Sequence, residues 1–405
     1  MKKMARSEEP IAATVGGFDA DPFLLNVENG TIDLRTGKLR EHRREDLITK
    51  LAPVEYDPGA EAPAWEDTLR RLLPSEELRG FFQRFVGYCL TGDVSEQVLV
   101  FLNGAGENGK STIITALRDV MGDYGKTEPE ELLTAKRHSS HPTELATLHG
   151  ARFVAAVETE EGKRLAESRV KQVTGGDKIS ARRMNEDFWD FTPTHKILLA
   201  SNHRPAVRGT DHAIWRRIKL VPFDVKLTAQ EKDPRRPEKL RAELSGILAW
   251  AVRGCLDWQQ HGLGEPQEVR DATAGYRDEQ DVLAEFLEER CIVAEGEQVL
   301  VADLYVAYRE WCEHSGEKFE TKNQLGRRLS DRGFEKSRGA GNVHVRLGIG
   351  LKSDPFSGPG GGSRSQRRPD RGDLSRGGDQ NGHAEKSSDV GQVRGFAGSG
   401  RGSAT

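Results

Sequence analysis

Short apolar runs and longer amphipathic stretches alternate along the chain. Apolar runs that end in polar or glycine-containing segments predict buried strands over 98–102, 153–157, 196–200 and 218–223. Apolar residues at helical spacing predict helices over 65–73, 76–90, 165–173, 240–262, 282–290, 301–315 and 322–332. The charged stretch 124–142 has neither pattern and is predicted to be an exposed loop. Strands that alternate with helices favour an α/β fold.

The segment 22–56 has a different pattern, with short alternating runs around tight turns. Asn29-Gly30 separates two of these runs, and this dipeptide between short strands is a strong hairpin signal. A second turn follows at Thr36-Gly37. Together with the two helices predicted after Pro58, this part of the chain is expected to form a small α+β module.

The run 98–102 stops at a glycine-rich turn, and a helical pattern follows. Gly104 and Gly109 have the G-x-x-x-x-G-K-S spacing of a P-loop, in the strand–loop–helix context that supports it. Glycines let backbone N–H groups close around phosphates, the lysine reaches the β- and γ-phosphates, and the serine hydroxyl holds Mg²⁺. The sequence therefore predicts a site for a nucleoside triphosphate and Mg²⁺. Its predicted residues are Gly104, Gly106, Asn108, Gly109, Lys110, Ser111 and Thr112.

Three glutamates follow the predicted strand 153–157. Ligands of open α/β sheets lie outside the carboxyl ends of the strands, so these side chains are well placed for catalysis. We expect Glu158 to bind Mg²⁺ together with Ser111, and a second glutamate to polarise the attacking water. The partner is either Glu160 or Glu161, and an acidic solvated loop is the alternative.

A basic segment from Thr174 to Asn185 follows, with aromatic residues close behind it. A glycine-led turn with cations and nearby aromatic rings suits phosphate contact with some base stacking. The predicted DNA-binding residues are Lys178, Arg182 and Arg183. A solvated hairpin with core aromatics behind it is the alternative.

Polar residues mark the ends of the next two predicted strands. Asn202 comes just after the run 196–200, where an amide can sense a γ-phosphate or orient water. A strand-capping asparagine is the alternative. Arg216 and Arg217 open the run 218–223, and an arginine there can act in trans on a neighbouring subunit's nucleotide. A pair of solvated strand-end arginines is the alternative.

Composition narrows the class of protein. The 405 residues allow two or three domains, and 31% charged against 36% hydrophobic residues indicate a polar, soluble protein. No run of about 18 apolar residues occurs and no apolar stretch follows the basic N-terminus, so neither a transmembrane helix nor a signal peptide is expected. The net charge of −4 means that nucleic acid would be bound by local basic clusters.

The cysteines are widely spaced and form no C-x-x-C pair. They therefore predict free thiols in a reducing cytoplasm rather than a zinc site or a disulfide framework. They are Cys89, Cys255, Cys291 and Cys312.

The C-terminal third contains a second basic element. The predicted helix 322–332 follows Thr321, a good N-cap, and resembles the recognition helix of a winged-helix domain. Lys322, Arg327 and Arg328 are predicted to contact DNA phosphates, and a solvated basic face is the alternative. From 353 onward the chain is rich in Gly, Ser, Arg and Asp, which predicts a disordered tail.

The order of these motifs resembles the superfamily 3 helicases of the AAA+ class. The motifs are GAGENGKS, VETEEG, TGGDKISARR, PTHKILLASNHRP and GTDHAIWRRIKLVPF. More closely, residues 22–347 resemble the ATPase half of the phage/plasmid primase–helicase family, which is related to the poxvirus primase–helicase. The resemblance implies a ring, usually a hexamer, that hydrolyses ATP between subunits while central hairpins pull on single-stranded DNA.

The resemblance also implies a role for each matching residue. It assigns Walker A to Lys110 and Ser111, Walker B to Glu158 and Glu160, sensor 1 to Asn202, the arginine finger to Arg216, and the pore hairpin to Lys178, Arg182 and Arg183. Two features depart from the family pattern. The acidic motif is E-T-E-E rather than D-D or D-E, and about twenty residues stand where relatives often carry a primase domain. A split gene with a separate primase as partner, a degenerate prophage copy and a stand-alone helicase are the open alternatives.

The sequence thus predicts a P-loop ATPase with flanking modules. Its predicted parts are a flexible N-terminus (1–20), an α+β module (21–92), an AAA+ ATPase core (93–235), a helical lid or collar (236–275), a winged-helix-like DNA-binding domain (276–350) and a disordered tail (351–405). The leading function is an ATP-dependent replicative helicase acting on single-stranded or forked DNA. The alternatives are an ATP-switched replication initiator or adaptor, and an unrelated P-loop kinase, against which Asn202 and Arg216 count.

Overall fold

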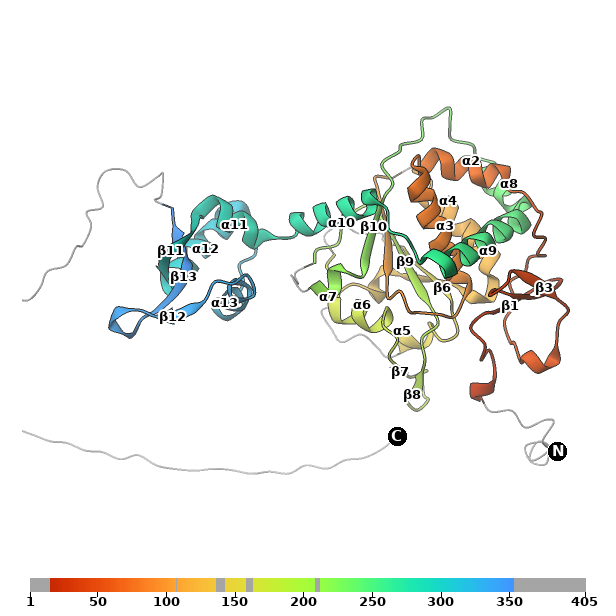
Figure 1. Ribbon diagram of the computed structural model, residues 1–405, viewed down its shortest axis with the longest axis horizontal. Helices are drawn as coiled ribbons and strands as arrows, with labels where there is room; N and C mark the ends of the chain where they lie inside the picture. Colours follow the sequence, from red (N-terminus) through yellow and green to blue (C-terminus); the bar gives the residue numbers. More distant parts are fainter. Residues whose placement is uncertain (1–14, 107, 136–142, 158–162, 208–211, 353–405) are drawn as a thin grey trace, which may run out of the picture. The chain divides into compact units, whose positions relative to one another are not determined.

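A parallel sheet of five strands forms the centre of the structure (Figure 1). The computed structural model describes residues 15–106, 108–135, 143–157, 163–207 and 212–352. The strands lie in the order β10-β4-β9-β6-β5, and every neighbouring pair is parallel. They are β4 (Leu99–Asn103), β5 (Gly125–Pro129), β6 (Phe153–Val157), β9 (Lys196–Ser201) and β10 (Ile218–Pro222). The structure has the mixed α/β architecture predicted from the sequence, with a sheet consistent with a P-loop core.

Helices cover both faces of this sheet. They are α2 (Pro63–Leu72), α3 (Glu76–Leu90), α4 (Lys110–Met121), α5 (Thr143–Ala146), α6 (Glu167–Val173), α7 (His212–Trp215), α8 (Arg236–Ala242), α9 (Leu244–His261) and α10 (Gln267–Glu279). In β4, Val100 and Leu102 belong to one buried cluster with α2, α3, α4 and α9, whereas Leu99 and Phe101 belong to another with α5, α6 and α7. Burial on both faces explains why the strands are continuous apolar runs in the sequence.

The strand β5 lies where the sequence predicts an exposed loop. It pairs in parallel with β6 at the edge of the sheet, while none of its side chains is buried. An edge strand is held by backbone hydrogen bonds and needs no apolar periodicity, so its sequence Gly-Lys-Thr-Glu-Pro carries little strand signal. The loop prediction is therefore wrong for 125–129, and residues 136–142 lie outside the described residues.

The single helix predicted over 240–262 is divided into α8 and α9. Glu243 lies between them with φ −107° and ψ 16°. Its carboxylate accepts hydrogen bonds from the backbone nitrogens of Ala64 and Trp65, both at 3.0 Å, at the start of α2. The first N–H groups of a helix have no partner within the helix, and a carboxylate is favourable there. The break thus joins two helices that are distant in the sequence.

Three antiparallel strands lie in the N-terminal part of the chain. They are β1 (Leu24–Val27), β2 (Gly30–Asp33) and β3 (Lys38–Arg40). The predicted hairpin is confirmed: the turn between β1 and β2 is formed by Glu28 and Asn29, and Gly30 is the first residue of β2, paired with Val27. Leu25 and Ile32 are fully buried in the cluster that includes α4 and α9. These strands therefore share a core with the helix that follows the P-loop.

Residues 282–352 have an apolar core of their own. Their elements are α11 (Val282–Arg290), β11 (Cys291–Leu300), α12 (Val301–Ser315), α13 (Lys322–Asp331), β12 (Lys336–Arg338) and β13 (His344–Leu351), with the strands in the order β11-β13-β12. The structure confirms the predicted bounds of α11 and α12, and α13 ends one residue early. Thr321 and Gln324 form a capping box at the start of α13. The strand β11 was not predicted, because most of its side chains are exposed.

Among the described residues, no helix is long and apolar enough to cross a bilayer.

Acidification is expected to destabilise the protein through His195, which directly precedes β9. His195 is 2% exposed, and burial lowers its pKa to about 4, with the charge of Lys196 acting in the same direction. The unfolded chain binds a proton below about pH 6.5 that the folded protein does not bind until about pH 4, so stability falls as the pH decreases through this range. Between about pH 7 and pH 4.5, the wild type should lose about 2 kcal/mol more than His195→Leu.

Chemical denaturation at these two pH values measures the difference. His314→Gln, on the exposed side of α12, is the control and should lose as much stability as the wild type. Equal losses in the wild type and His195→Leu would contradict the assignment.

Candidate functional site

The turn between β4 and α4 depends on two glycines. Gly109 has a φ of 75°, and a Cβ there would lie 2.5 Å from Leu72 Cδ1 in α2. A Cβ on Gly104 would lie 2.1 Å from the backbone oxygen of Phe223, just after β10. Both distances are shorter than any side chain tolerates, so the loop can pack this closely only with glycine at these positions.

Lys110, the first residue of α4, turns back into this loop. Its Nζ donates hydrogen bonds to Gly104 O at 2.6 Å, Asn108 Oδ1 at 3.0 Å and Asn202 Oδ1 at 3.1 Å. The side chain is buried, and this burial lowers the pKa of Lys110. All three acceptors are neutral oxygens, so no carboxylate in this set offsets the ammonium charge. An uncompensated ammonium group at a helix N-terminus suits a phosphate.

Two asparagines hold Lys110 from different sides. Asn202 follows β9, which lies between β4 and β6, so the structure brings this predicted residue beside the P-loop. Asn108 is buried, and its Nδ2 donates to Phe223 O at 2.9 Å. Asn108 therefore ties Lys110 to the segment after β10. The sequence identifies Asn108 only by its position inside the P-loop. Its link between Lys110 and Phe223 has no local sequence signal.

Part of the predicted metal site lies outside the described residues. Ser111, in the first turn of α4, is exposed, and Thr112 is half-buried beside it. Glu158, Glu160 and Glu161 fall outside the described residues, and the strand before them, β6, ends at the same edge of the sheet as β4. The described part of the chain contains no group of three or more His, Cys, Asp or Glu side chains that could hold a metal ion. The residues around Lys110 fit a triphosphate. Of the predicted Mg²⁺ ligands, Ser111 is the one that lies within the described residues.

The two arginines before β10 have different surroundings. The guanidinium of Arg217 is mostly buried and donates to Ala213 O at 2.7 Å and Gln97 Oε1 at 3.3 Å. Arg216 is exposed, and its guanidinium has no hydrogen bond or ion pair with another described residue. Arg217 therefore holds the fold together, whereas Arg216 is available to a ligand or a second chain.

Arg216 lies at the amino ends of the sheet strands, whereas Lys110 lies beyond their carboxyl ends. Ile218 at the start of β10 pairs with Leu99 at the start of β4, and β4 leads to the P-loop only at its other end. The five residues of a strand separate its two ends by roughly 16 Å, which is longer than an arginine side chain. Within one chain, Arg216 therefore cannot contact a phosphate that Lys110 binds.

An antiparallel hairpin carries the predicted DNA-binding cations (Figure 1). Its strands are β7 (Ile179–Ala181) and β8 (Trp189–Phe191). Arg182 lies over the ring of Phe188 at 5.2 Å, and Arg183 lies over Trp189 at 5.7 Å. Lys178 is exposed where β7 begins.

The connection between β7 and β8 also exposes two large apolar side chains. Met184 is 76% exposed and Phe188 is 59% exposed. Exposed apolar groups beside arginines form a surface on which bases can stack while phosphates are neutralised. Phe191, by contrast, is buried in the core.

The cations of α13 divide into two groups. Lys322 and Arg327 are exposed. Arg328 is mostly buried and pairs with Asp281 at 3.2 Å and Glu320 at 3.0 Å, so it is already neutralised. The prediction that Arg328 contacts DNA is therefore replaced by a structural role, which depends on Glu320, eight residues away, and on Asp281, 47 residues away in the sequence.

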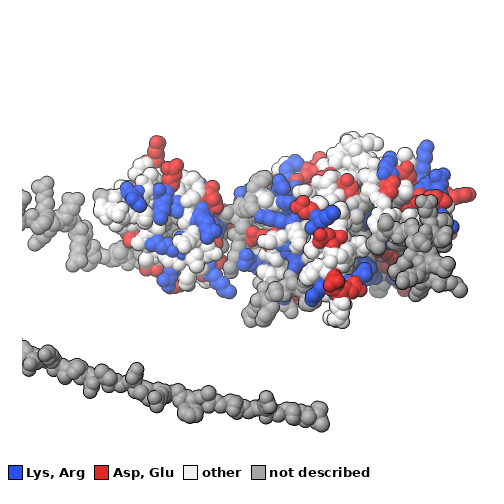
Figure 2. Space-filling view, turned by 90° about the horizontal axis from the view of Figure 1, so that it is seen from below, with Lys and Arg blue, Asp and Glu red and all other residues white. Residues whose placement is uncertain are grey.

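Two exposed cations of β12, Lys336 and Arg338, were not predicted. They occupy a short strand without an apolar pattern, so the sequence offered no local signal for them. Figure 2 shows Lys and Arg side chains gathered on one face of this part of the chain.

A cleft of about 580 Å³ opens beside the P-loop. Gly109 and Thr112 line it together with α2 and the segment 227–237. Two ion pairs connect its walls, Arg71 with Glu231 at 2.6 Å and Arg236 with Asp67 at 3.2 Å. Its volume is in the range of small-molecule sites.

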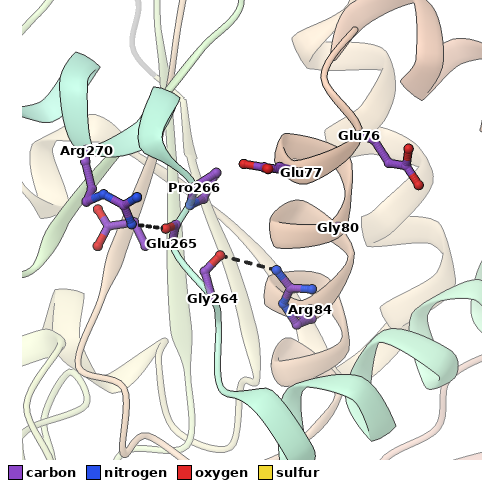
Figure 3. Close-up of a pocket in the computed structure, with 8 residues that line it drawn as sticks. All are labelled: Glu76, Glu77, Gly80, Arg84, Gly264, Glu265, Pro266 and Arg270. Carbon is purple, nitrogen blue, oxygen red and sulfur yellow. Dashed lines mark hydrogen bonds between the residues drawn. The ribbon is translucent and has the colours of Figure 1, made fainter.

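A second pocket, of about 540 Å³, lies between α3 and the turn before α10 (Figure 3). Arg84 and Arg270 line it, but they donate to the backbone oxygens of Gly264 and Glu265 and so hold its wall. Glu76 and Glu77, on the same helix as Arg84, add acidic side chains to the lining (Figure 3). This pocket shares no lining residue with the P-loop and is poorly suited to a phosphate.

Comparisons with protein families divide the chain into three matched segments. Residues 1–74 match a family described as "D5 N terminal like", residues 102–217 match a family of unknown function, and residues 278–343 match a "Poxvirus D5 protein-like" family. The chain is 29% identical over 319 residues to "Putative helicase L207/L206" of Acanthamoeba polyphaga mimivirus. By these matches the chain is similar to the viral D5-like primase–helicases.

Other viral relatives show the same extent of similarity. "Putative helicase 121R" of Invertebrate iridescent virus 3 is 24% identical over 331 residues, and "Putative primase C962R" of African swine fever virus (isolate Tick/Malawi/Lil 20-1/1983) is 25% identical over 322 residues. Each match, like that to the mimivirus protein, covers 73% of this chain and 33–35% of the relative. The chain thus spans about a third of the length of these curated relatives.

One solved structure has a similar fold. The apo structure of the C-terminal region of NrS-1 (A form) matches with a TM-score of 0.50 and 14% identity, over 82% of this chain and 83% of that one. At this identity the match concerns the fold alone.

Proposed function

We propose that this chain is an ATP-dependent DNA helicase of superfamily 3, with an AAA+ ATPase core. The observation that carries the proposal is the ammonium group of Lys110, which bonds to neutral oxygens among the described residues and is held in a glycine turn at the carboxyl ends of the parallel strands. Helicase and primase names among its relatives support a role in DNA replication. We also propose the division into domains predicted from the sequence, with a winged-helix-like part near the C-terminus.

ATP with Mg²⁺ supplies the phosphoanhydride bond whose hydrolysis drives the motor. The loop amides and Lys110 would bind the β- and γ-phosphates, and Ser111 and Glu158 would hold the metal. Glu160 would polarise the attacking water. Asn202 is bonded to Lys110, so a γ-phosphate that takes over the ammonium group would free the Asn202 amide to orient water.

A homo-oligomer is part of the proposal, because Arg216 lies at the amino ends of the strands and cannot reach the nucleotide bound by its own chain. We propose a ring, most simply a hexamer, in which Arg216 of one subunit reaches the nucleotide on the next. The hairpin β7–β8 would line the central channel and contact single-stranded DNA.

The partners that we propose are forked DNA and a primase, on another chain or another segment. We place the protein in the cytoplasm, where its four free cysteines, all buried, stay reduced.

Strand displacement from a forked duplex tests the function. The wild type should release the displaced strand in an ATP-dependent manner, and Lys110→Ala should not. ATP hydrolysis without displacement would instead support the second candidate, an initiator or adaptor that uses ATP to control its assembly. The exposed cations Lys322, Arg327, Lys336 and Arg338, on a part with its own core, favour that candidate.

Phe188→Ala is expected to weaken binding of single-stranded DNA about 5- to 150-fold, because one base would lose its stacking partner. Arg183→Ala is expected to reduce the slope of the logarithm of the binding constant against the logarithm of the salt concentration by about 1, because one phosphate contact is lost. Anisotropy titrations of a labelled oligonucleotide at several salt concentrations measure both. Lys126→Ala, an exposed cation on β5, is the control for the change in charge. If Phe188→Ala binds DNA like the wild type, the hairpin is not the contact surface.

Leu227→Trp is expected to fill the cleft beside Gly109, where we propose that the base of ATP binds. It should weaken ATP binding at least about tenfold and leave binding of inorganic tripolyphosphate unchanged, because tripolyphosphate has no base. Leu227→Met should bind both like the wild type. Calorimetric titration with the two ligands measures the effect, and equal weakening of both would place the base elsewhere.

A further inference from the structure

The segment after β9 connects the phosphate site to helix α10. Asn202 in this segment accepts a hydrogen bond from Lys110. Two residues later, Arg204 Nε donates to Asn103 Oδ1 at 3.1 Å, on the last residue of the P-loop strand. Arg204 Nη1 also donates to both carboxylate oxygens of Glu279, the last residue of α10, at 2.5 and 2.7 Å. One guanidinium thus bridges β4 and α10.

Two more hydrogen bonds fasten the same segment to α10. The hydroxyl of Tyr276 donates to Pro205 O, and Val207 N donates to the side chain of Gln280 at 3.0 Å. Three contacts therefore fall within residues 204–207. A displacement of this segment would be transmitted to the last turn of α10.

Tyr276 also contacts the residue before Arg216. Its buried ring packs edge-on against Trp215, with centroids 5.2 Å apart and an interplanar angle of 82°. The same ring lies 6.0 Å from Phe101 in β4. Helix α10 therefore contacts the segment that follows β9 and touches Lys110, at the carboxyl ends of the strands. It also contacts Trp215, the residue next to Arg216, at their amino ends.

The bridge made by Arg204 adds little to stability. The side chains of Arg204 and Glu279 are 34% and 55% exposed, and ion pairs in water contribute little to the folded state. The pair can therefore rearrange without unfolding its surroundings. Tyr276, in contrast, is fully buried and would act as the rigid part of the connection.

We propose that Arg204 is a positioning residue that links the phosphate site to Arg216 through Glu279 and α10. Binding of a nucleotide at Lys110 shifts the segment of Asn202, Arg204 passes the shift to α10, and Tyr276 passes it to Trp215. This inference rests on the proposed function, because it requires a nucleotide on the P-loop and an active Arg216. The nucleotide bound to one subunit would thereby change the position of that subunit's Arg216 at the site of the next subunit.

Steady-state ATP hydrolysis in the presence of DNA tests the link. Arg204→Ala and Glu279→Gln should each lower kcat at least about fivefold and leave KM for ATP within about threefold. The double variant should be no worse than either single one, because both remove the same connection. Arg277→Ala, an exposed arginine on the same helix, is the control and should match the wild type. A tenfold rise in KM at unchanged kcat, or additive losses in the double variant, would overturn the link.

Arg204→Lys separates positioning from simple charge pairing. Lysine keeps the charge next to Glu279, but its compact ammonium group lacks the planar fork by which Arg204 Nε faces Asn103 while Nη1 faces Glu279. It should therefore behave like Arg204→Ala. Full recovery of kcat in Arg204→Lys would overturn the bridging role.

Hydrogen exchange gives a readout independent of catalysis. Amides of 267–279 should exchange at least about fivefold more slowly when a non-hydrolysable ATP analogue binds the wild type, and this change should be absent in Arg204→Ala. If the analogue binds and α10 exchanges as before, the link is wrong and the proposed function stands. If the wild type binds no analogue, the proposed function fails, and the link fails with it.

Discussion

Replacing Lys110 with methionine is expected to reduce ATP hydrolysis at least about 10²- to 10³-fold, the size of effect seen when one preorganised donor is removed from a charged transition state. Its ammonium group is buried and, among the described residues, bonded to neutral oxygens of Gly104, Asn108 and Asn202. A phosphate would therefore meet a positive charge that no carboxylate of this set offsets. Methionine has a similar length and no charge, so this variant removes the interaction and keeps the packing.

Two measurements separate loss of chemistry from loss of folding. Steady-state hydrolysis and titration with a nucleotide analogue should both be impaired in Lys110→Met, whereas its thermal unfolding should stay close to that of the wild type. Lys126→Met, an exposed lysine of β5, serves as the control and should hydrolyse ATP normally. Substantial hydrolysis by Lys110→Met would refute the assignment of the P-loop.

Replacing Arg216 with alanine is expected to abolish hydrolysis and leave nucleotide binding intact. Arginines supplied in trans contribute about 10³- to 10⁵-fold to phosphoryl transfer. Arg216 is exposed at the amino edge of the sheet, so its own phosphate site is out of reach, and the loss arises at the interface between subunits. Arg217→Ala should instead lower the melting temperature, because Arg217 holds Ala213 and Gln97 from a buried position.

Mixed oligomers test whether Arg216 acts between subunits. Neither Lys110→Met nor Arg216→Ala should hydrolyse ATP alone. Mixed together, some interfaces combine an intact Lys110 from one subunit with an intact Arg216 from the other, and part of the activity should return. No recovery on mixing, or loss of nucleotide binding in Arg216→Ala, would show that Arg216 does not act in trans.

Several features of the fold could be predicted because their causes are local. Ser75 caps α3 by accepting a hydrogen bond from Leu78 N, only three residues away, and the predicted bounds of that helix hold. The capping box of Thr321 and Gln324 marks the start of α13 in the same way. The P-loop is also local, because its glycines and Lys110 lie within seven consecutive residues.

Other features depend on segments that are far apart in the sequence. Glu243 interrupts a helical pattern because its carboxylate caps α2, 178–179 residues earlier. Strand β5 exists because β6 offers it a backbone edge, and no side-chain pattern records that pairing. Arg328 is neutralised by Asp281, which lies before another helix.

The pair Arg216 and Arg217 shows this division most clearly. Residue type, spacing and strand position identify an arginine pair with access to phosphate, and all of these can be read along the chain. Which of the two is available depends on Gln97 and Ala213, which surround Arg217 in the folded protein and leave Arg216 exposed. Helix caps, turns and glycine loops follow from neighbouring residues because their hydrogen bonds span a few positions. Burial and the choice of partners follow from packing between distant segments, so they appear only once the chain has folded.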